Sequence, residues 1–352
     1  GKDYSLGGIT LLCRFDGQRV TMASQMSEAD ETVSSLYSVK SEQATMLSFD
    51  TYNYLVHYFG QPQGSMSDDP NGTLGGDYEF IISSASAERI ELKGKKYGNR
   101  IVMKALTEDQ TWKQYLTKIK KVEDDAFFYE YDLLMDGLYT GQMIRSNYTF
   151  IVTYYDEIGK VHQKTVPFMF TADGLRFHEP VTIDGQTMQN FVWKNELISF
   201  VCTDEGATGV KLAGVYTAGY QSYDYYPGTY QMDFYRLNDE TGQLEVASQE
   251  VRLLKNEDGK SYWLKGLEYD ILVMYDKPRG GLSVSPQLLE KVQGGYVYLA
   301  MWDVMNDYVL RNKSIGLISY ATTNGIYLVD NGVWMGEVSG FIFGVYNSQE
   351  ED

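Results

Sequence analysis

One segment of this sequence repeats apolar residues at the spacing of a helix, and it lies between stretches that alternate like strands. Thr107 occupies an N-cap position, and Gln110 follows at the spacing of a capping box. Glu108 and Asp109 place negative charge in the first turn. The apolar face is made of Trp112, Tyr115, Leu116, Ile119 and Val122. We therefore expect one amphipathic helix at about residues 108–122.

This helix needs an apolar surface to cover, so we expect it to lie on a sheet and to connect two β regions. Lys118, Lys120 and Lys121 follow at its end, where positive charge suits the helix dipole. A lysine-rich binding helix is the alternative interpretation, although lysines of this kind commonly form the solvated face of a helix.

The remaining sequence favours strands joined by tight turns. The 352 residues include 30 Tyr, which suits pleated surfaces, and 34 Gly, which suits turns. Apolar runs flank the dipeptides Asp16-Gly17 and Asp173-Gly174, which is typical of hairpins. Residues 52–59 are compatible with a short helix or a strand, and Pro286 to Val292 with a brief helical turn. We predict a mainly β protein of two or three sandwich-like or barrel-like units.

The domain organisation follows from this reading and from the length, because a single core does not grow to this size. We expect a first β domain at residues 1–106, a connecting helix at 107–123 and a second β unit at 124–206. A C-terminal β domain then covers 207–352, after a turn-rich boundary at residues 203–209.

The charge limits the classes of partner. A net charge of −18 argues against binding to nucleic acid and against electrostatic attraction to anionic lipid. No run of eighteen apolar residues is present, so no membrane-spanning helix is expected. The first residues resemble the middle of a protein, so we expect a leader upstream of Gly1. Cys13 and Cys202 are expected to be small buried apolar residues, with a disulfide between them as the alternative.

Common catalytic motifs are missing. His57, His162 and His178 are dispersed, so the helical spacing of zinc ligands is absent. The sequence contains no glycine-rich phosphate loop and no nucleophile elbow. The 48 acidic residues leave open a pair of carboxylates that hydrolyses glycosides. We therefore regard enzymatic activity as undecided and a non-enzymatic role as favoured.

Two acidic loops suggest Ca²⁺, the one cofactor considered; otherwise no cofactor is expected. The first loop offers Asp68, Asp69, Asn71 and Asp77, and a second lies at residues 238–240. Neither loop matches a complete twelve-residue calcium loop, so ordinary turn chemistry is the alternative.

Tyrosines crowd the segment at residues 216–235. Aromatic rings on an exposed loop can stack on the apolar faces of sugars while their hydroxyls supply hydrogen bonds. Cross-strand packing is the alternative for alternating tyrosines, and burial in a strand is the alternative for a tryptophan. The candidate ligand-binding residues are Tyr220, Tyr223, Tyr225, Tyr226, Tyr230 and Trp302.

Four segments in the N-terminal half resemble a known family. They are VTMAS at 20–24, MLSFDTYNYLVHYF at 46–59, GDYEFI at 76–81 and LKGKKYGNR at 92–100. In this order they are similar to the Bacteroidetes surface lipoprotein family catalogued as domain of unknown function 4302. The resemblance covers about residues 9–205, and the pattern at 263–289 is similar to β modules that end many such lipoproteins.

The resemblance implies an outer-membrane or cell-surface lipoprotein, anchored by a lipidated cysteine upstream of Gly1. It also implies nutrient uptake beside a TonB-dependent importer and its substrate-binding lipoproteins. The family has no agreed catalytic or binding residues to carry over.

The leading functional hypothesis is therefore non-enzymatic binding of a glycan or another nutrient near the tyrosine-rich segment. The first alternative is a hydrolase, which requires two carboxylates that converge in a pocket. The second alternative is an accessory structural protein of an importer complex, which would show an exposed apolar patch and no concave pocket.

Overall fold

The computed structural model describes residues 7–41, 44–61, 74–106, 110–156, 158–238 and 240–347. The chain divides into two compact units, Gly1–Val215 and Tyr216–Asp352, which we call the N-terminal and C-terminal units. Both consist mainly of antiparallel strands, which confirms the predicted fold class. No helix within the described residues has the length and apolar character needed to cross a bilayer.

The N-terminal unit starts with a seven-stranded sheet in which each strand pairs with the next one along the chain. Its strands are β1 (Leu11–Phe15), β2 (Arg19–Ser24), β3 (Val33–Ser41), β4 (Thr45–Phe49), β5 (Glu79–Ala85), β6 (Arg89–Gly94) and β7 (Arg100–Lys104). Residues 52–59 are mainly helical, because α1 (Tyr54–His57) continues into a 3₁₀ turn at Tyr58–Gly60. Leu55 and Val56 of α1 join the apolar core of this sheet.

A closed barrel of eight antiparallel strands completes the N-terminal unit, and β15 closes it by pairing with β8. The strands are β8 (Glu130–Met135), β9 (Leu138–Ser146), β10 (Thr149–Tyr155), β11 (Val161–Phe170), β12 (Gly174–Ile183), β13 (Gln186–Lys194), β14 (Ser199–Cys202) and β15 (Val210–Val215). Its buried side chains include Tyr131, Phe150, Phe168, Phe170, Phe177 and Phe200. Packed aromatic rings therefore fill the barrel, as is usual for a barrel of this size.

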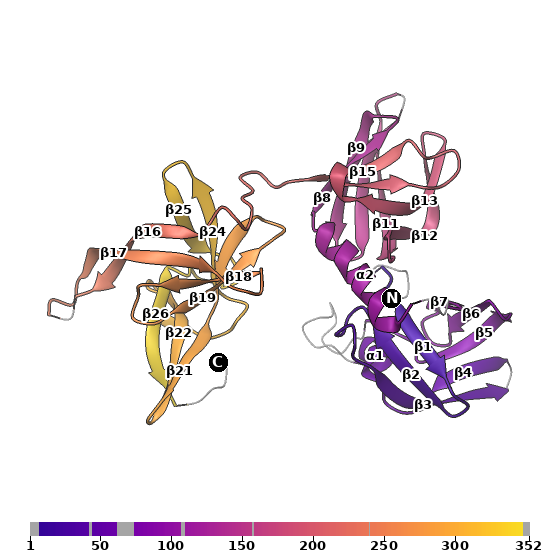
Figure 1. Ribbon diagram of the computed structural model, residues 1–352, viewed down its shortest axis with the longest axis horizontal. Coiled ribbons are helices and arrows are strands. Elements are labelled where there is room, and N and C mark those ends of the chain that lie inside the picture. Colours follow the sequence, from indigo (N-terminus) through magenta and orange to yellow (C-terminus); the bar gives the residue numbers. More distant parts are fainter. Residues whose placement is uncertain are drawn as a thin grey trace. The chain divides into compact units, whose positions relative to one another are not determined.

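Helix α2 (Trp112–Asp125) joins the sheet to the barrel and begins later than the sequence suggested. Its N-cap is Thr111, which forms a capping box with Gln114, whereas Thr107 lies outside the described residues. The predicted apolar face is confirmed, since Leu116, Ile119 and Val122 are buried in the core that includes the barrel side chains. Figure 1 shows α2 between the barrel and the first sheet.

The barrel also holds the end of α2. Tyr131 and Arg145 both donate hydrogen bonds to the carbonyl oxygen of Ala126, at 2.8 and 3.1 Å. The Arg145 guanidinium also lies 3.4 Å from Glu123 and 5.0 Å above the Phe170 ring. These bonds satisfy a carbonyl that the helix itself leaves unpaired and fix the helix on the barrel.

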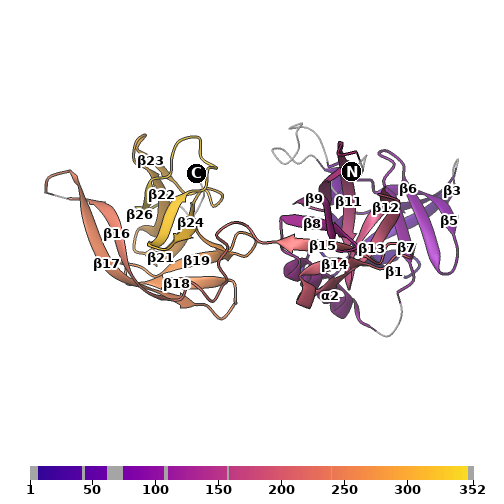
Figure 2. The same ribbon diagram turned by 90° about the horizontal axis from the view of Figure 1, so that it is seen from above.

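The C-terminal unit is a sandwich of two sheets that share one apolar core. The larger sheet has the order β16 (Gly228–Leu237), β17 (Leu244–Lys255), β18 (Ser261–Lys265), β19 (Ile271–Asp276), β20 (Gly281–Val284), β24 (Leu317–Thr322) and β25 (Gly325–Asp330). The smaller sheet contains β21 (Gln287–Val292), β22 (Gly295–Asp303), β23 (Tyr308–Leu310) and β26 (Gly340–Tyr346). Figure 2 shows the two sheets from above.

The structure tests two local predictions, a helical turn near Pro286 and the state of Cys13 and Cys202. The helical turn expected near Pro286 is wrong, because β21 pairs with β22 along most of its length. Cys13 and Cys202 are both free, so the disulfide does not form. Burial raises the pKa of both thiols, and Cys202 is almost fully buried, as expected for small apolar residues.

Candidate functional site

The tyrosine-rich segment packs down onto the larger sheet of the C-terminal unit. The hydroxyl of Tyr223 donates to the carbonyl oxygen of Ser261 at 2.7 Å, and the hydroxyl of Tyr262 donates back to the Tyr223 carbonyl at 2.7 Å. The rings of Tyr223 and Tyr262 stack with centroids 4.6 Å apart. Tyr226 donates to Gly280, also at 2.7 Å. These hydroxyls are therefore engaged in holding the segment on β18 and on the loop after β19.

The candidate tyrosines differ in how far their side chains are buried. Tyr226 is 1% exposed and belongs to the core, where burial raises its pKa so that its hydroxyl remains a donor. Tyr230 is half-buried and donates to the Tyr226 carbonyl at 2.6 Å. Tyr220 is half-buried and accepts a bond from Tyr275 at 3.1 Å, while Tyr225 is 46% exposed. Most of this cluster serves packing, and Tyr225 presents the most accessible ring of the five.

Trp302 lies away from the tyrosine-rich segment. It is half-buried on β22, where it pairs with Val309 and Gly340 of the smaller sheet. Its neighbours along the strand, such as Met301, point into the core instead. The partners of the tyrosine-rich segment come from the larger sheet, so the structure does not assemble the six predicted ligand-binding residues into one site.

The acidic loop is described only at its end. Asp68, Asp69 and Asn71 lie outside the described residues. Asp77 is 6% exposed, and its carboxylate accepts four hydrogen bonds: from the amides of Lys96, Tyr97 and Asn99 and from the side chain of Asn99, at 2.7 to 3.2 Å. The described residues contain no cluster of three or more metal-ligating side chains.

Four N–H donors use the acceptor positions of the Asp77 carboxylate, two on each oxygen. Ca²⁺ would have to displace these bonds. Asp77 thus holds the turn between β6 and β7, and the calcium site remains a prediction for the other residues of the loop.

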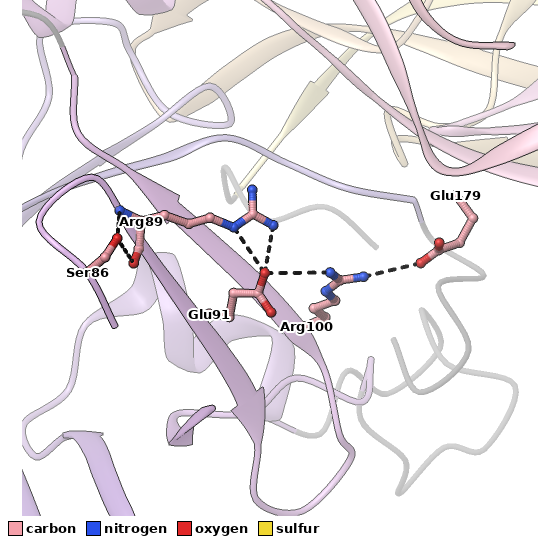
Figure 3. Close-up of polar contacts among 5 residues, drawn as sticks. All are labelled: Ser86, Arg89, Glu91, Arg100 and Glu179. Atoms are coloured by element: carbon pink, nitrogen blue, oxygen red, sulfur yellow. Dashed lines mark hydrogen bonds and ion pairs between the residues drawn. The ribbon is translucent and has the colours of Figure 1, made fainter. Parts of the chain in front are cut away.

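Among the described residues, a larger and a smaller cleft of the N-terminal unit are each lined by a single carboxylate. The larger one, about 750 Å³, contains Asp30, and the smaller one, about 250 Å³, contains Glu91. Figure 3 shows Glu91 between Arg89, at 2.7 Å, and Arg100, at 3.9 Å. The hydrogen bond from Arg89 lowers the pKa of Glu91, so this carboxyl stays ionised.

Arg100 continues this chain of ion pairs to Glu179 on β12, at 3.3 Å. The link joins the first sheet to the barrel. A glycosidase needs one carboxylate to hold a proton while a second acts as base or nucleophile. Neither cleft presents such a pair among the described residues.

The outer side of the larger sheet in the C-terminal unit forms a surface that was not predicted from the sequence. Strand register places Leu254, Trp263 and Leu272 in one cross-strand row, and Ile318 beside Val329 in another. Alternate residues on the same strands point into the core. We call this surface the open face; it consists of Leu254, Trp263, Leu272, Met274, Ile318, Tyr320, Tyr327 and Val329.

The aromatic rings of the open face are accessible. Tyr320 and Tyr327 are 49% and 44% exposed and stack with centroids 5.2 Å apart and planes inclined by 14°. Trp263 is 37% exposed. The signal in the sequence is that Ile326–Val329 of β25 are apolar on both alternating faces, whereas a strand with one solvated face alternates with polar residues.

Comparison with family models identifies both halves of the chain. Residues 1–195 match a model described as Domain of unknown function (DUF4302). Residues 203–340 match a second model, DUF4987, also described as a domain of unknown function. The second match starts close to the predicted boundary, whereas the compact units divide after Val215. No curated protein and no solved structure matches this chain.

Proposed function

Since this chain belongs to the family described as Domain of unknown function (DUF4302), we propose its function from its own surfaces: it is a non-enzymatic protein that binds a glycan on the open face. The observation that carries the proposal is the stacked, half-exposed pair Tyr320 and Tyr327 on the same sheet surface as Trp263. Flat aromatic rings bind the apolar faces of sugars, and phenol hydroxyls add hydrogen bonds.

The spacing of the rings favours a chain of sugars over a monosaccharide. Trp263 lies on β18 and Tyr320 on β24, three strand positions apart in the order of the sheet. At about 4.8 Å per strand, the separation across the sheet is roughly 14 Å. A ligand that contacts both rings must therefore be longer than one sugar ring. Arg252 and Lys265 are cross-strand partners beside this row and provide polar contacts at its border.

Glycan-array screening and calorimetry test the proposal, with neutral plant and mucin oligosaccharides as probes. We expect binding that weakens at least fivefold in Trp263→Ala and in the double variant Tyr320→Ala/Tyr327→Ala. These side chains are exposed, so the fold should survive, as circular dichroism will verify. The control is Tyr225→Ala, an exposed tyrosine outside the open face. Absence of binding to every glycan, or equal binding by all variants, would refute the proposal.

A second candidate function rests on the aliphatic part of the open face. Leu254, Met274 and Val329 are 42%, 43% and 39% exposed, and Leu272 and Ile318 lie among them. An exposed apolar patch of this kind commonly marks a protein interface. The accessory role in an importer complex predicts that the wild-type chain co-purifies with the importer, that Met274→Asp abolishes this assembly, and that the chain binds no glycan. Co-purification of the importer with wild-type and variant chains decides between the two.

We also propose display at the outer surface of the cell through an upstream lipid anchor, beside a TonB-dependent importer. The support is the family resemblance together with a net charge of −18, which does not favour anionic lipid or nucleic acid. Metabolic labelling of the full-length protein with a palmitate analogue, combined with protease treatment of intact cells, tests this. An unlabelled or protease-protected protein would contradict it.

A further inference from the structure

The larger cleft of the N-terminal unit lies outside the open face and has a distinct lining. Its volume of about 750 Å³ is in the range of small-ligand sites. It lies where β1 and β2, the segment before β3 and the first turn of α2 meet. The lining combines the basic residues Arg14 and Lys113 with Asp30, apolar side chains that include Leu106 and Trp112, and several threonines.

Arg14 is held by an aromatic ring. Its guanidinium lies 5.3 Å from the centroid of the Trp112 ring, and its side chain is exposed. This cation–π contact holds the guanidinium beside the indole while its N–H groups remain available as donors. Among the described residues, Arg14 makes no ion pair with a carboxylate. It therefore presents a fork of donors, which matches a carboxylate in a bidentate manner.

Asp30, the one acidic side chain among the described lining residues, is paired with a lysine. Lys113 lies 2.8 Å from Asp30, and this hydrogen bond lowers the pKa of Asp30 and raises that of Lys113. Two positive groups and one negative group leave an excess of one positive charge among the described lining residues. This local excess favours an anion at this place, against the repulsion that the net charge of −18 exerts on anions elsewhere.

The capping box already uses part of the helix end. The amide of Gln114 is already bonded to the Thr111 hydroxyl at 3.2 Å, and the Gln114 side chain accepts from the Thr111 amide at 2.9 Å. Recognition therefore depends on Arg14. Hydroxyl and amide side chains, such as Thr32 and Gln110, line the same cleft and suit a polyhydroxylated ligand.

We propose that this cleft is a second binding site, which takes a sugar that carries a carboxylate, such as a uronic or sialic acid. The carboxylate pairs with Arg14. The hydroxyls of the sugar bond to the threonine and glutamine side chains, and its apolar edge lies against Leu106 and Ala29. This site is independent of the open face, because it belongs to the other compact unit.

Calorimetry of the intact chain tests the site with trigalacturonate and sialyllactose as probes, and with lactose as the neutral control. We expect the acidic sugars to bind and lactose to bind at least tenfold more weakly. Affinity should fall between 20 and 150 mM salt, since screening weakens contacts between exposed charges. Arg14→Gln should weaken binding at least tenfold, and Arg14→Lys should recover only part of it because a lysine has no fork.

The matched control is Arg19→Gln, an exposed arginine on β2 that does not line the cleft. Trp263→Ala should leave binding of acidic sugars unchanged, which separates this site from the open face. Thermal melting of each variant confirms that the N-terminal unit remains folded. Equal binding of acidic and neutral sugars, unchanged affinity in Arg14→Gln, or no binding of either acidic probe would overturn the proposal.

Discussion

The variant Asp77→Ala tests how the turn between β6 and β7 is held in the first sheet. The carboxylate satisfies four N–H donors at the turn between β6 and β7, and it is almost fully buried. Gly94 lies directly against it, so a methyl group at that position would collide with the carboxylate. The substitution leaves all four donors without this acceptor and opens a small space beneath Gly94.

The magnitude follows from the number of bonds and from what water can replace. A hydrogen bond to a charged group contributes about 1.5–3 kcal/mol, and bonds that share one carboxylate are not additive. Water can reach part of the vacated space, so we expect a loss of about 3–4 kcal/mol. For a unit of this size, with a shift of about 2–4 °C per kcal/mol, that corresponds to roughly 6–16 °C in melting temperature.

Thermal and urea melts followed by circular dichroism measure this change. The two compact units should unfold in separate transitions, and only that of the N-terminal unit should move. Glu88→Ala, an exposed carboxylate in the neighbouring turn between β5 and β6, is the control and should shift the transition by less than about 0.5 kcal/mol.

Stabilisation by Ca²⁺ would be the result that contradicts this role of Asp77. If Asp77 were a cation ligand, millimolar Ca²⁺ would stabilise the wild-type N-terminal unit, and Asp77→Ala would abolish that effect. A shift of this kind, or an Asp77→Ala melt equal to that of wild type, would refute the reasoning that Asp77 serves the turn.

Three further predictions concern packing, capping and pH. Tyr226→Ala should destabilise the C-terminal unit by about 3–5 kcal/mol, whereas Tyr225→Ala, at the adjacent exposed position, should change it by less than about 0.5 kcal/mol in urea melts. Thr111→Ala should cost the N-terminal unit about 1 kcal/mol through loss of the N-cap, and a cost near zero would mean that α2 starts elsewhere. Hydrogen bonds from Asn306 and from Trp334 lower the pKa of Asp303, so its contribution is complete above its ordinary pKa of 3.8 and is lost as the pH falls below that value. Asp303→Asn should therefore flatten the acid limb of the stability curve of the C-terminal unit, and an unchanged limb would contradict this assignment.

Local patterns predicted much of the N-terminal unit correctly. The Asp16-Gly17 dipeptide lies in a hairpin turn, and Gly17 has a φ of 87°, which a glycine adopts without strain. The Asp173-Gly174 dipeptide also joins two strands, but its glycine serves a different purpose, because a side chain at Gly174 would collide with the backbone of Phe191. The turn was predictable from the dipeptide, and the close approach of a third strand was not.

The start of α2 shows the limit of local signals. The sequence TEDQTWKQ at residues 107–114 contains the capping-box spacing twice, at Thr107 with Gln110 and at Thr111 with Gln114. Both are valid locally, and the structure uses the second one. Burial of Leu116 and Ile119 in the core fits either start, so the apolar face alone does not choose between the two caps.

The candidate site was less predictable than the fold. Composition and alternation identified a mainly β chain, the apolar face of its helix and the crowding of tyrosines, because these are properties of neighbouring residues. The sequence could not distinguish buried Tyr226 from exposed Tyr225, since the difference depends on contacts with β18 and the loop after β19. The sequence also could not show that residues 203–209 connect β14 to β15, since β15 becomes a strand of the barrel only by pairing with the distant β8. Pairings between distant strands decide which rings are covered and which are left open, and no local period encodes them.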